Sequence, residues 1–413
     1  MSYKLPSKAS TSRAKTIMID ECSMLTEVMF AGVLKLIDSH AERIIWTGDP
    51  NQLPPIGGGR TFVDLISYME NYHKNKIGIL TTEMRQGAGG DDVSFAQIFS
   101  NLDLTDKDVI HRIKNNSLDG RLKFIKYEDV NQLEKLFFEN LTDVTGMKDL
   151  DDIDSFNKSL GAEINKYTNY PNSNDIENWQ ILTPTRFLGV GSYYFNEKIH
   201  NKYRQDIVDS WNKYPRSKNK PQSIQNIVFG DKIISNVNGE RDYWDNGAGR
   251  EYIANGEIGI MVSYPGHYGK SDKNKDWYKF RFSSFGTKVF SYRKQDFGGE
   301  NADSKLELAY ALTIHKSQGS SFGQTIVIIN GKSSFISKEL LYTAFSRQED
   351  SLIILSDLSI EDLLLYSYDW YSDTKQRFTD LFEKPNIVQI EKNNQKKYFE
   401  KNLIHRTLRG EMV

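Results

Sequence analysis

Two adjacent carboxylates, Asp20 and Glu21, follow the short apolar run Thr16–Ile19. Neighbouring residues at the end of a strand point to different sides, so the two carboxylates can do different chemistry. One can hold Mg²⁺, directly or through water. The other can orient or deprotonate an attacking water molecule. The alternative is a turn that carries two surface acids, and the pair alone does not decide between the two interpretations.

The segment Gly48–Pro55 is more specific. The amide of Gln52 both donates and accepts hydrogen bonds, which suits a group that senses a γ-phosphate or an attacking water. Pro54 and Pro55 stiffen the chain after it, because proline fixes φ. With the Asp-Glu pair upstream, the segment indicates a nucleotide-hydrolysis site rather than a proline-rich turn.

Two arginines and one polar segment extend this chemistry. Arg85 and Arg347 are candidates to stabilise charge on a transferred phosphoryl group, although a surface arginine is the default interpretation of each. The segment Thr313–Gly319 places small donors and a base at a predicted strand-to-helix turn. Such a segment suits contact with a phosphate backbone on one side and a nucleotide on the other.

His315 lacks a second His or Cys at ligand spacing, which argues against a metal site there.

The elements that must position these residues follow an α/β pattern. Thr16–Ile19 and Arg43–Thr47 are predicted to be buried parallel strands, with a helix from Leu25 to Ser39 between them. In open α/β sheets, ligands bind beyond the carboxyl ends of the strands. The polar residues that fall at these ends are Asp20, Glu21, Asp49 and Gln52.

A second α/β lobe is predicted to begin at Trp179–Pro184 and to include a buried strand at Thr325–Ile329. Between them, residues 229–303 show apolar alternation and the turn signal Asn255-Gly256, which predict a small antiparallel barrel inserted in this lobe. The barrel aromatics either stack nucleic-acid bases or fill the barrel's own core, and core filling is favoured. These aromatics are Trp244, Trp277, Tyr278, Phe280, Phe282, Phe285, Phe290 and Tyr292.

Composition narrows the class of protein. The 413 residues carry a net charge of -2, so a nucleic-acid partner would have to be held by local positive charge. Cys22 is the only cysteine, which excludes an internal disulfide and indicates a cytoplasmic location. No apolar run approaches about 18 residues, so no membrane span is expected.

A phosphate-binding loop is not found in these 413 residues. Gly269-Lys270-Ser271 and Gly331-Lys332-Ser333 both look like the end of such a loop. The loop also requires a glycine five residues before its second glycine, and Tyr264 and Ile326 occupy those positions. Neither segment is therefore predicted to bind phosphate.

In this order, the segments resemble the motifs of RecD-like superfamily 1 DNA helicases, a group that includes Dda-type phage enzymes. The resemblance covers the chain from about Lys15 to Asp357. Ile19–Met24 resembles motif II, Gly48–Pro55 motif III and Leu80–Gln86 motif IV. Leu182–Arg186 resembles the start of the second motor domain. Tyr310–Gly319 resembles motif V, and Tyr342–Arg347 resembles motif VI.

The resemblance implies two RecA-like P-loop NTPase motor domains, the first incomplete here, with an SH3-type barrel inserted in the second. It also implies ATP between the domains, single-stranded DNA across both, and movement from 5′ to 3′. The predicted division is residues 1–100 for the first domain, 101–175 for a helical linker, 176–228 and 304–365 for the second domain, 229–303 for the barrel and 366–413 for a basic tail.

The resemblance also implies roles for single residues. Asp20 would bind Mg²⁺, Glu21 would be the catalytic base and Gln52 would sense the γ-phosphate. Arg85 and Arg347 would be arginine fingers. Nucleotide state and DNA grip would be coupled through Gln318 and Gly319. The residues expected to contact DNA are Thr183, Thr185, Thr313, His315 and Lys316.

The phosphate loop of the family and the DNA-contacting motif after it have no counterpart in this sequence. The polypeptide is then a fragment of a longer reading frame, or a second polypeptide supplies the loop, or the protein no longer hydrolyses ATP. The expected function is the C-terminal portion of an ATP-dependent 5′-to-3′ DNA helicase. The rival is a non-catalytic subunit that binds single-stranded DNA.

Overall fold

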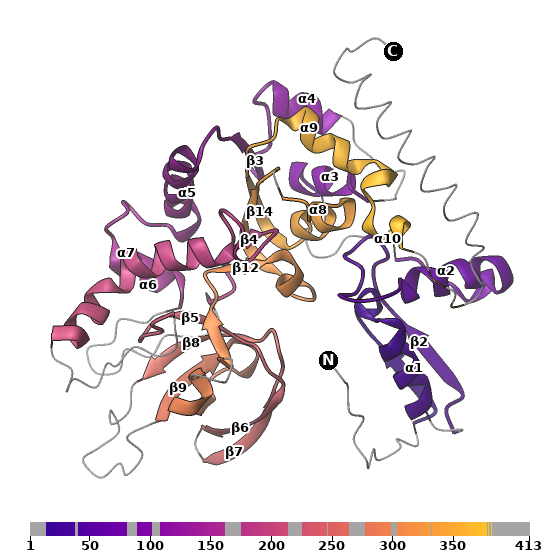
Figure 1. Cartoon of the computed structure of the whole chain (residues 1–413), viewed down its shortest axis with the longest axis horizontal. Coiled ribbons are helices and arrows are strands. Elements are labelled where there is room, and N and C mark those ends of the chain that lie inside the picture. Colours follow the sequence, from indigo (N-terminus) through magenta and orange to yellow (C-terminus); the bar gives the residue numbers. More distant parts are fainter. Residues whose placement is uncertain are drawn as a thin grey trace.

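The structure is a computed structural model (Figure 1), and it describes residues 14–37, 40–80, 89–100, 108–161, 175–213, 225–245, 247–263, 277–298, 304–331, 333–377, 379 and 381. The predicted motif IV arginine, Arg85, lies outside these ranges. So do the segment Gly269-Lys270-Ser271 and most of the predicted basic tail.

The first lobe is small. Strands β1 (Thr16–Ile19) and β2 (Arg43–Trp46) pair in parallel, with Met18 opposite Ile45. The helices of this lobe are α1 (Glu27–Leu36) and α2 (Thr61–Tyr72), with the 3-10 turns η1 (Cys22–Met24) and η2 (Lys74–Lys76). Helix α1 begins where the Thr26 side chain accepts a hydrogen bond from the Met29 N–H, which satisfies one free donor of the first turn.

Among the residues that the structure describes, one face of the β1–β2 pair is covered. Ile19 and Trp46 pack on the small core of the lobe, which contains Cys22, Leu25 and Phe62. On the other face, Met18 is 64% exposed and its partner Ile45 is 38% exposed. Both strands form where the sequence predicted them, but the prediction that they are buried was wrong. The described part of the sheet has two strands and one covered face.

The second lobe is built on a five-stranded, fully parallel sheet with the order β12-β4-β13-β14-β3. These strands are Ala311–Thr313, Trp179–Thr183, Phe322–Ile329, Gln348–Ser356 and Leu122–Lys126. The predicted strand at Thr325–Ile329 is part of β13 and is largely buried. Strand β3 comes from the region predicted to be a helical linker, so this region contributes an edge strand that the sequence analysis did not include.

Helices cover both faces of this sheet. In Figure 1, α5 and α7 lie on one side of it, and α3 and α8 lie on the other. Helix α5 begins after Asp129, whose side chain accepts from the Gln132 N–H, and ends at Gly146 in the left-handed region. The helices are α3 (Asp91–Gln97), α4 (Asp108–Lys114), α5 (Val130–Thr145), α6 (Ile153–Ser159), α7 (Ser192–Lys213), α8 (Lys338–Phe345), α9 (Ile360–Leu364) and α10 (Asp373–Gln376).

The sequence predicted a small antiparallel barrel in this lobe, and the structure has an antiparallel sheet inserted between α7 and β12. Its strand order is β11-β5-β8-β9-β10-β6-β7. The strands are β5 (Lys232–Ser235), β6 (Gly239–Trp244), β7 (Ala248–Ile253), β8 (Ile258–Ser263), β9 (Trp277–Phe282), β10 (Val289–Arg293) and β11 (Leu306–Leu308). Among the described residues no pairing joins β11 to β7, so a closed barrel is not found.

The aromatic side chains of the insertion fill its interior. Phe280, Phe282, Phe290 and Tyr292 are buried and contact one another at ring-centroid distances of 5.2–6.2 Å. Trp244 and Tyr252, by contrast, are exposed. The packing supports the core-filling interpretation over a base-stacking face.

Lys232 lies at the junction of the insertion and the second lobe, and it is fully buried. Its Nζ donates to the Trp179 main-chain oxygen at 2.8 Å and lies 5.0 Å from the centre of the Trp179 ring. Burial lowers the pKa of Lys232 to about 7, although the nearby Glu177 acts in the opposite direction. A charged lysine at this position therefore costs folding free energy.

Replacing Lys232 with methionine is expected to raise the free energy of unfolding by about 1–4 kcal/mol at pH 7, because an apolar side chain of similar length avoids the desolvation cost. Between the folded pKa of about 7 and the unfolded value of 10.5, the unfolded chain binds a proton that the folded chain does not. The free energy of unfolding of the wild type should then rise with pH between about pH 7 and pH 10.5. The difference in this free energy between Lys232→Met and the wild type should shrink toward zero over the same range. Urea unfolding at several pH values measures the free energy of unfolding of the wild type and of the variant. Lys135→Met, at an exposed lysine, is the control. Equal pH slopes in wild type and Lys232→Met would contradict the argument.

No helix in the described ranges combines the length and the apolar character that crossing a bilayer requires.

Candidate nucleotide cleft and nucleic-acid surface

Asp20 lies directly after β1 and is held as an anion. Its Oδ1 accepts a 2.5 Å hydrogen bond from Thr47 Oγ1 and a 2.9 Å bond from the Glu21 N–H. These two bonds, the Thr47 bond first, lower the pKa of Asp20. Thr47 follows β2, so the ends of both strands meet at this carboxylate. An ionised, positioned carboxylate is a suitable partner for a divalent cation.

Glu21 has an unusual backbone conformation. Its φ of 54° and ψ of 41° lie in the left-handed region, which costs energy for a residue other than glycine. Gly319 lies across from it, since a methyl group placed on Gly319 would be 3.9 Å from Glu21 Oε1. The predicted motif II carboxylate and the end of the predicted motif V segment therefore face each other.

Gly48 allows the predicted motif III to approach motif II closely. A Cβ at this position would lie 3.0 Å from the Cys22 nitrogen and 3.1 Å from the Phe62 ring. Thr47, which directly precedes motif III, is joined to motif II by main-chain hydrogen bonds, from Cys22 N to Thr47 O and from Thr47 N to Ile19 O, both at 2.9 Å. A larger residue at 48 would force this junction apart.

Leu53 joins the first lobe to the second. Its N–H donates to Thr343 Oγ1 in α8 at 3.0 Å, and its carbonyl accepts from Gln318 Nε2 at 3.1 Å. The Leu53 side chain is buried in the large core of the second lobe. One residue of the predicted motif III therefore contacts the predicted motifs V and VI.

Gln52 precedes this junction and lines a small pocket. Its Oε1 is buried and has no hydrogen-bond partner among the described residues. A buried acceptor without a partner is costly, and it is expected to be satisfied by water or by a ligand. The other residues of the pocket are Ser23, Pro50, Pro54, Pro55, Arg60, Phe62, Val63 and Thr374.

Arg347 does not point into the cleft. It is 1% exposed, and its guanidinium group donates to Thr343 O at 3.0 Å, Ser320 O at 3.1 Å and Ser346 Oγ at 3.1 Å. To act as an arginine finger, the side chain would have to leave these partners. In this conformation, Arg347 connects the end of α8 to the loop after η6 (Ile314–Ser317).

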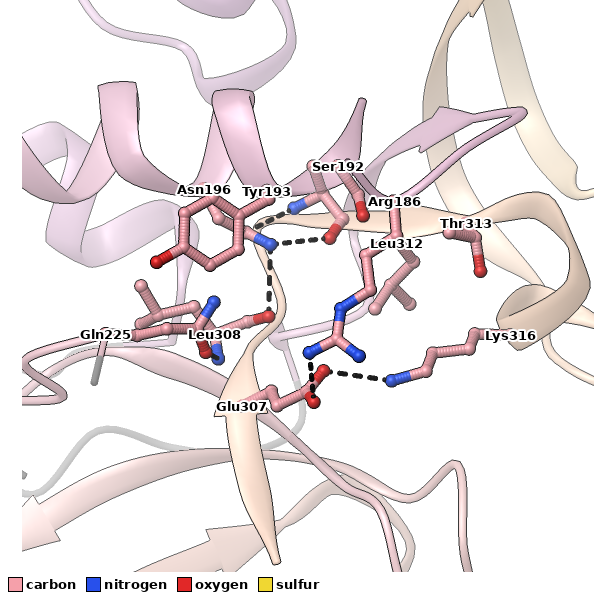
Figure 2. A pocket seen from close by; sticks show the side chains of 11 residues that line it. Arg186, Ser192, Tyr193, Asn196, Gln225, Glu307, Leu308, Leu312, Thr313 and Lys316 are labelled. Carbon is pink, nitrogen blue, oxygen red and sulfur yellow. Dashed lines mark hydrogen bonds and ion pairs between the residues drawn. The ribbon is translucent and has the colours of Figure 1, made fainter. Parts of the chain in front are cut away.

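A second site lies where the inserted sheet meets the parallel sheet (Figure 2). Glu307 of β11 bridges two cations there: Arg186 at 2.5 Å and Lys316 at 3.0 Å. Lys316 Nζ also donates to Asn236 Oδ1 at 2.9 Å. Phe187, beside Arg186, is 66% exposed, and the Arg186 guanidinium carbon lies 4.6 Å from the centre of its ring.

The other residues predicted to bind DNA lie in different environments. Thr183 is buried and donates to Thr185 O at 2.8 Å, whereas Thr185 donates to Leu188 O at 3.1 Å. Thr313 is half-buried and lines the pocket in Figure 2. His315 lies near the charges of Asp373 and Arg377, and burial lowers its pKa.

The structure therefore places Glu21, which follows Asp20, opposite Gly319, and it joins Gln318 to Leu53, which follows Gln52. Thr313 and Lys316 line the second site. Among the described residues no group of three or more His, Cys, Asp or Glu side chains could hold a metal ion. Four residues of these sites were not predicted from the sequence: Thr47, Arg186 as a pocket residue, Glu307 and Arg377. Arg186 follows the Thr-Pro-Thr motif directly, but the others carry no sequence signal.

Two family models match the chain. The AAA domain matches residues 2–122, and the UvrD-like helicase C-terminal domain matches residues 308–355. Together with the ordered motifs and the RecD relatives below, they confirm the resemblance to RecD-like superfamily 1 helicases.

The RecBCD enzyme subunit RecD of Buchnera aphidicola subsp. Schizaphis graminum (strain Sg) is 24% identical over 83% of this chain and 54% of that protein. An uncharacterized protein of Methanocaldococcus jannaschii, MJ1519, is 28% identical over 90% of this chain. The chain thus spans 31% and 54% of the lengths of these two relatives. Among solved structures, the Bacteroides Pif1 helicase in complex with ADP-AlF3 and ssDNA is 17% identical over 93% of this chain and 76% of that chain, with a TM-score of 0.37.

Proposed function

We propose that this chain is the C-terminal portion of an ATP-dependent DNA helicase that moves from 5′ to 3′ on single-stranded DNA. The observation that carries the proposal is the junction at Leu53. There, the predicted motif III bonds to Gln318 and Thr343, while Glu21 faces Gly319. Four separate segments with nucleotide-hydrolysis chemistry therefore converge between two lobes, where closure on a nucleotide can move one lobe against the other.

The proposal includes a phosphate loop supplied by polypeptide outside these 413 residues. The exposed face of the β1–β2 pair, with Met18 and Ile45, supports it. Parallel sheets are normally covered on both faces, and two strands alone are marginally stable. Additional polypeptide on this face would complete a RecA-like domain. The name of the Buchnera relative, a subunit of an enzyme, is consistent with a partner chain as the source.

In the proposed reaction, the residues of this chain hold the attacking water and the developing charge. When Mg²⁺ is bound, it neutralises phosphate charge, and Asp20 is the carboxylate that would hold it. Glu21 would accept a proton from the attacking water at its carboxylate, and the Gln52 amide would orient that water or the γ-phosphate. Gln318 would transmit the state of the cleft, because its amide is already bonded to Leu53 O.

The proposed DNA surface is the site in Figure 2. Lys316 and Arg186 provide positive charge, and the exposed Phe187 provides a ring on which a base can stack. The inserted antiparallel sheet, which we propose to be of the SH3 type, contributes Glu307 and Asn236 to this surface. Glu307 already neutralises both cations, so binding is expected to be weak.

The 413-residue polypeptide is expected to bind single-stranded DNA weakly, without sequence preference and with sensitivity to salt. Few phosphates would be neutralised, so the slope of log K against log salt should be shallow, at about 0.7 for each phosphate contact. Fluorescence anisotropy of a labelled oligonucleotide at several salt concentrations measures affinity and slope. Lys316→Ala combined with Thr183→Ala should weaken binding further.

Lys135→Ala is the control for this experiment, since it removes one exposed positive charge on α5 that is not among the residues lining the pocket in Figure 2. It should leave the affinity and the salt slope unchanged. Absence of binding at low salt would contradict the proposed DNA surface, as would binding that the double variant does not alter.

A further inference from the structure

The segment that follows α9 returns to the first lobe and contacts the loop after Gln52. We call residues 369–379 the strap. Its first part is anchored on α8, where the buried carboxylate of Glu339 accepts hydrogen bonds from Ser372 Oγ, from Asp373 N at 2.8 Å and from Thr374 N at 3.4 Å. The same helix carries Thr343, which accepts the Leu53 N–H. The strap therefore begins on the helix that contacts the predicted motif III.

Arg377 is the main contact of the strap with the first lobe. Its Nη1 lies within hydrogen-bonding distance of three main-chain oxygens, those of Pro55 at 2.9 Å, Gly57 at 2.8 Å and Gly59 at 2.9 Å. Its Nη2 pairs with Asp373 at 3.0 Å, which orients the guanidinium group. Because the planar guanidinium group presents several donors at fixed angles, it can hold several acceptors of one loop at once.

The loop that Arg377 holds contains three consecutive glycines, Gly57–Gly59. Gly57 and Gly59 have φ values of 137° and 89°, a region that glycine adopts easily and other residues rarely. Such a loop loses much conformational entropy when it is fixed. Without Arg377 its three carbonyl groups would bond to water, and nothing else among the described contacts joins them to the second lobe.

Two further contacts extend the strap along the first lobe. Thr374 O accepts from Arg60 Nη1 at 3.3 Å, and Thr379 Oγ1 donates to Glu27 Oε1 of α1 at 3.0 Å. Thr374 also lines the pocket that contains Gln52. The strap thus forms one wall of the pocket that holds the unpartnered Gln52 oxygen.

We propose that Arg377 is a positioning residue: by holding the loop from Pro55 to Gly59, it fixes Gln52 at the nucleotide cleft and ties its position to α8. The part of this inference that concerns hydrolysis rests on the proposed function. The structural part, that Arg377 holds residues 51–53 in place, is independent of the proposed function.

The test is amide hydrogen exchange in the 413-residue polypeptide and in Arg377→Ala. The N–H groups of Asn51, Gln52 and Leu53 are bonded to Asp49 Oδ1, Asp49 O and Thr343 Oγ1. In the variant they are expected to exchange about tenfold to a hundredfold faster, as the loss of hydrogen bonds to a charged group implies. Amides of the five-stranded sheet should not change.

Lys375→Ala is the matched control, because Lys375 is a strap cation whose side chain pairs with Asp369 on the strap itself. It should leave exchange at residues 51–53 as in wild type, and Arg377→Lys should restore only part of the protection. Unchanged exchange in Arg377→Ala would overturn the inference, whether or not the protein hydrolyses ATP. Faster exchange throughout the protein would also overturn it, since it would show general loss of stability.

A second measurement uses protein to which a phosphate loop has been supplied. There, Arg377→Ala should lower kcat for ATP hydrolysis about tenfold or more and change KM little, because Gln52 would act on the reacting water rather than on nucleotide affinity. Unchanged kcat would overturn the positioning role. If the wild-type protein did not hydrolyse ATP, the proposed function would be wrong, and the exchange experiment alone would decide on the strap.

Discussion

Glu21→Gln is expected to lower the rate of ATP hydrolysis by about 10²–10⁴-fold, the usual contribution of a catalytic base. The protein for this experiment carries a phosphate loop supplied by fusion or by a co-expressed polypeptide. Glutamine keeps the size of the side chain but cannot accept the proton of the attacking water. ATP binding should persist, because Asp20 and its bonds to Thr47 Oγ1 and the residue 21 N–H are retained.

Steady-state hydrolysis and a fluorescent nucleotide titration measure the two quantities separately. Glu42→Gln is the control, since Glu42 is an exposed acid of the same lobe that pairs with Lys15. It should leave both quantities unchanged. A loss of less than about tenfold in Glu21→Gln would assign Glu21 a structural role in its left-handed turn rather than a catalytic one.

The second large effect concerns the phosphate loop. The 413-residue polypeptide by itself is expected to hydrolyse ATP at close to the background rate. Such a loop supplies a lysine and several N–H groups that neutralise the β- and γ-phosphates, and nothing in this sequence replaces it. The Gly331 N–H is already bonded to Asp357 Oδ1 at 2.6 Å, so that glycine segment is not free to bind phosphate.

Supplying the loop should raise the rate by at least about 10²–10³-fold, since even one preorganised donor contributes that much elsewhere. A loop polypeptide with its lysine replaced by alanine is the control, and it should give little increase. Robust DNA-stimulated hydrolysis by the 413-residue polypeptide alone would contradict this expectation and show that another segment binds the phosphates.

Regular elements with a strong local pattern were predictable from the sequence. The run Thr325–Ile329 is continuous and β-branched, and it lies in the centre of the parallel sheet. Strand β3 was missed because Leu122–Lys126 is short, contains two lysines and lies at the edge of the sheet. Its partner β14 is more than two hundred residues away in the sequence, so no local pattern indicates the pairing.

The sequence predicted which residue types belong to the nucleotide site, but it did not predict which of these residues contact one another. The sequence supplies Gln318 and Thr343 within recognisable segments, but their bonds to Leu53 span 265 and 290 residues. The contacts of Arg347 were likewise not predictable. The sequence does not distinguish an arginine that faces a nucleotide from one that is buried against main-chain oxygens. Arg377 lies in no motif, and its role follows only from the position of the loop at Pro55–Gly59.

Strand displacement is the measurement that tests the central claim most directly. A fluorescently labelled duplex is prepared with either a 5′ or a 3′ single-stranded tail, and it is mixed with loop-supplied protein and ATP. The account predicts ATP-dependent displacement from the 5′-tailed duplex, little from the 3′-tailed duplex, and none with Glu21→Gln. Displacement of neither duplex by protein that binds single-stranded DNA would contradict the helicase assignment and favour a non-catalytic DNA-binding subunit.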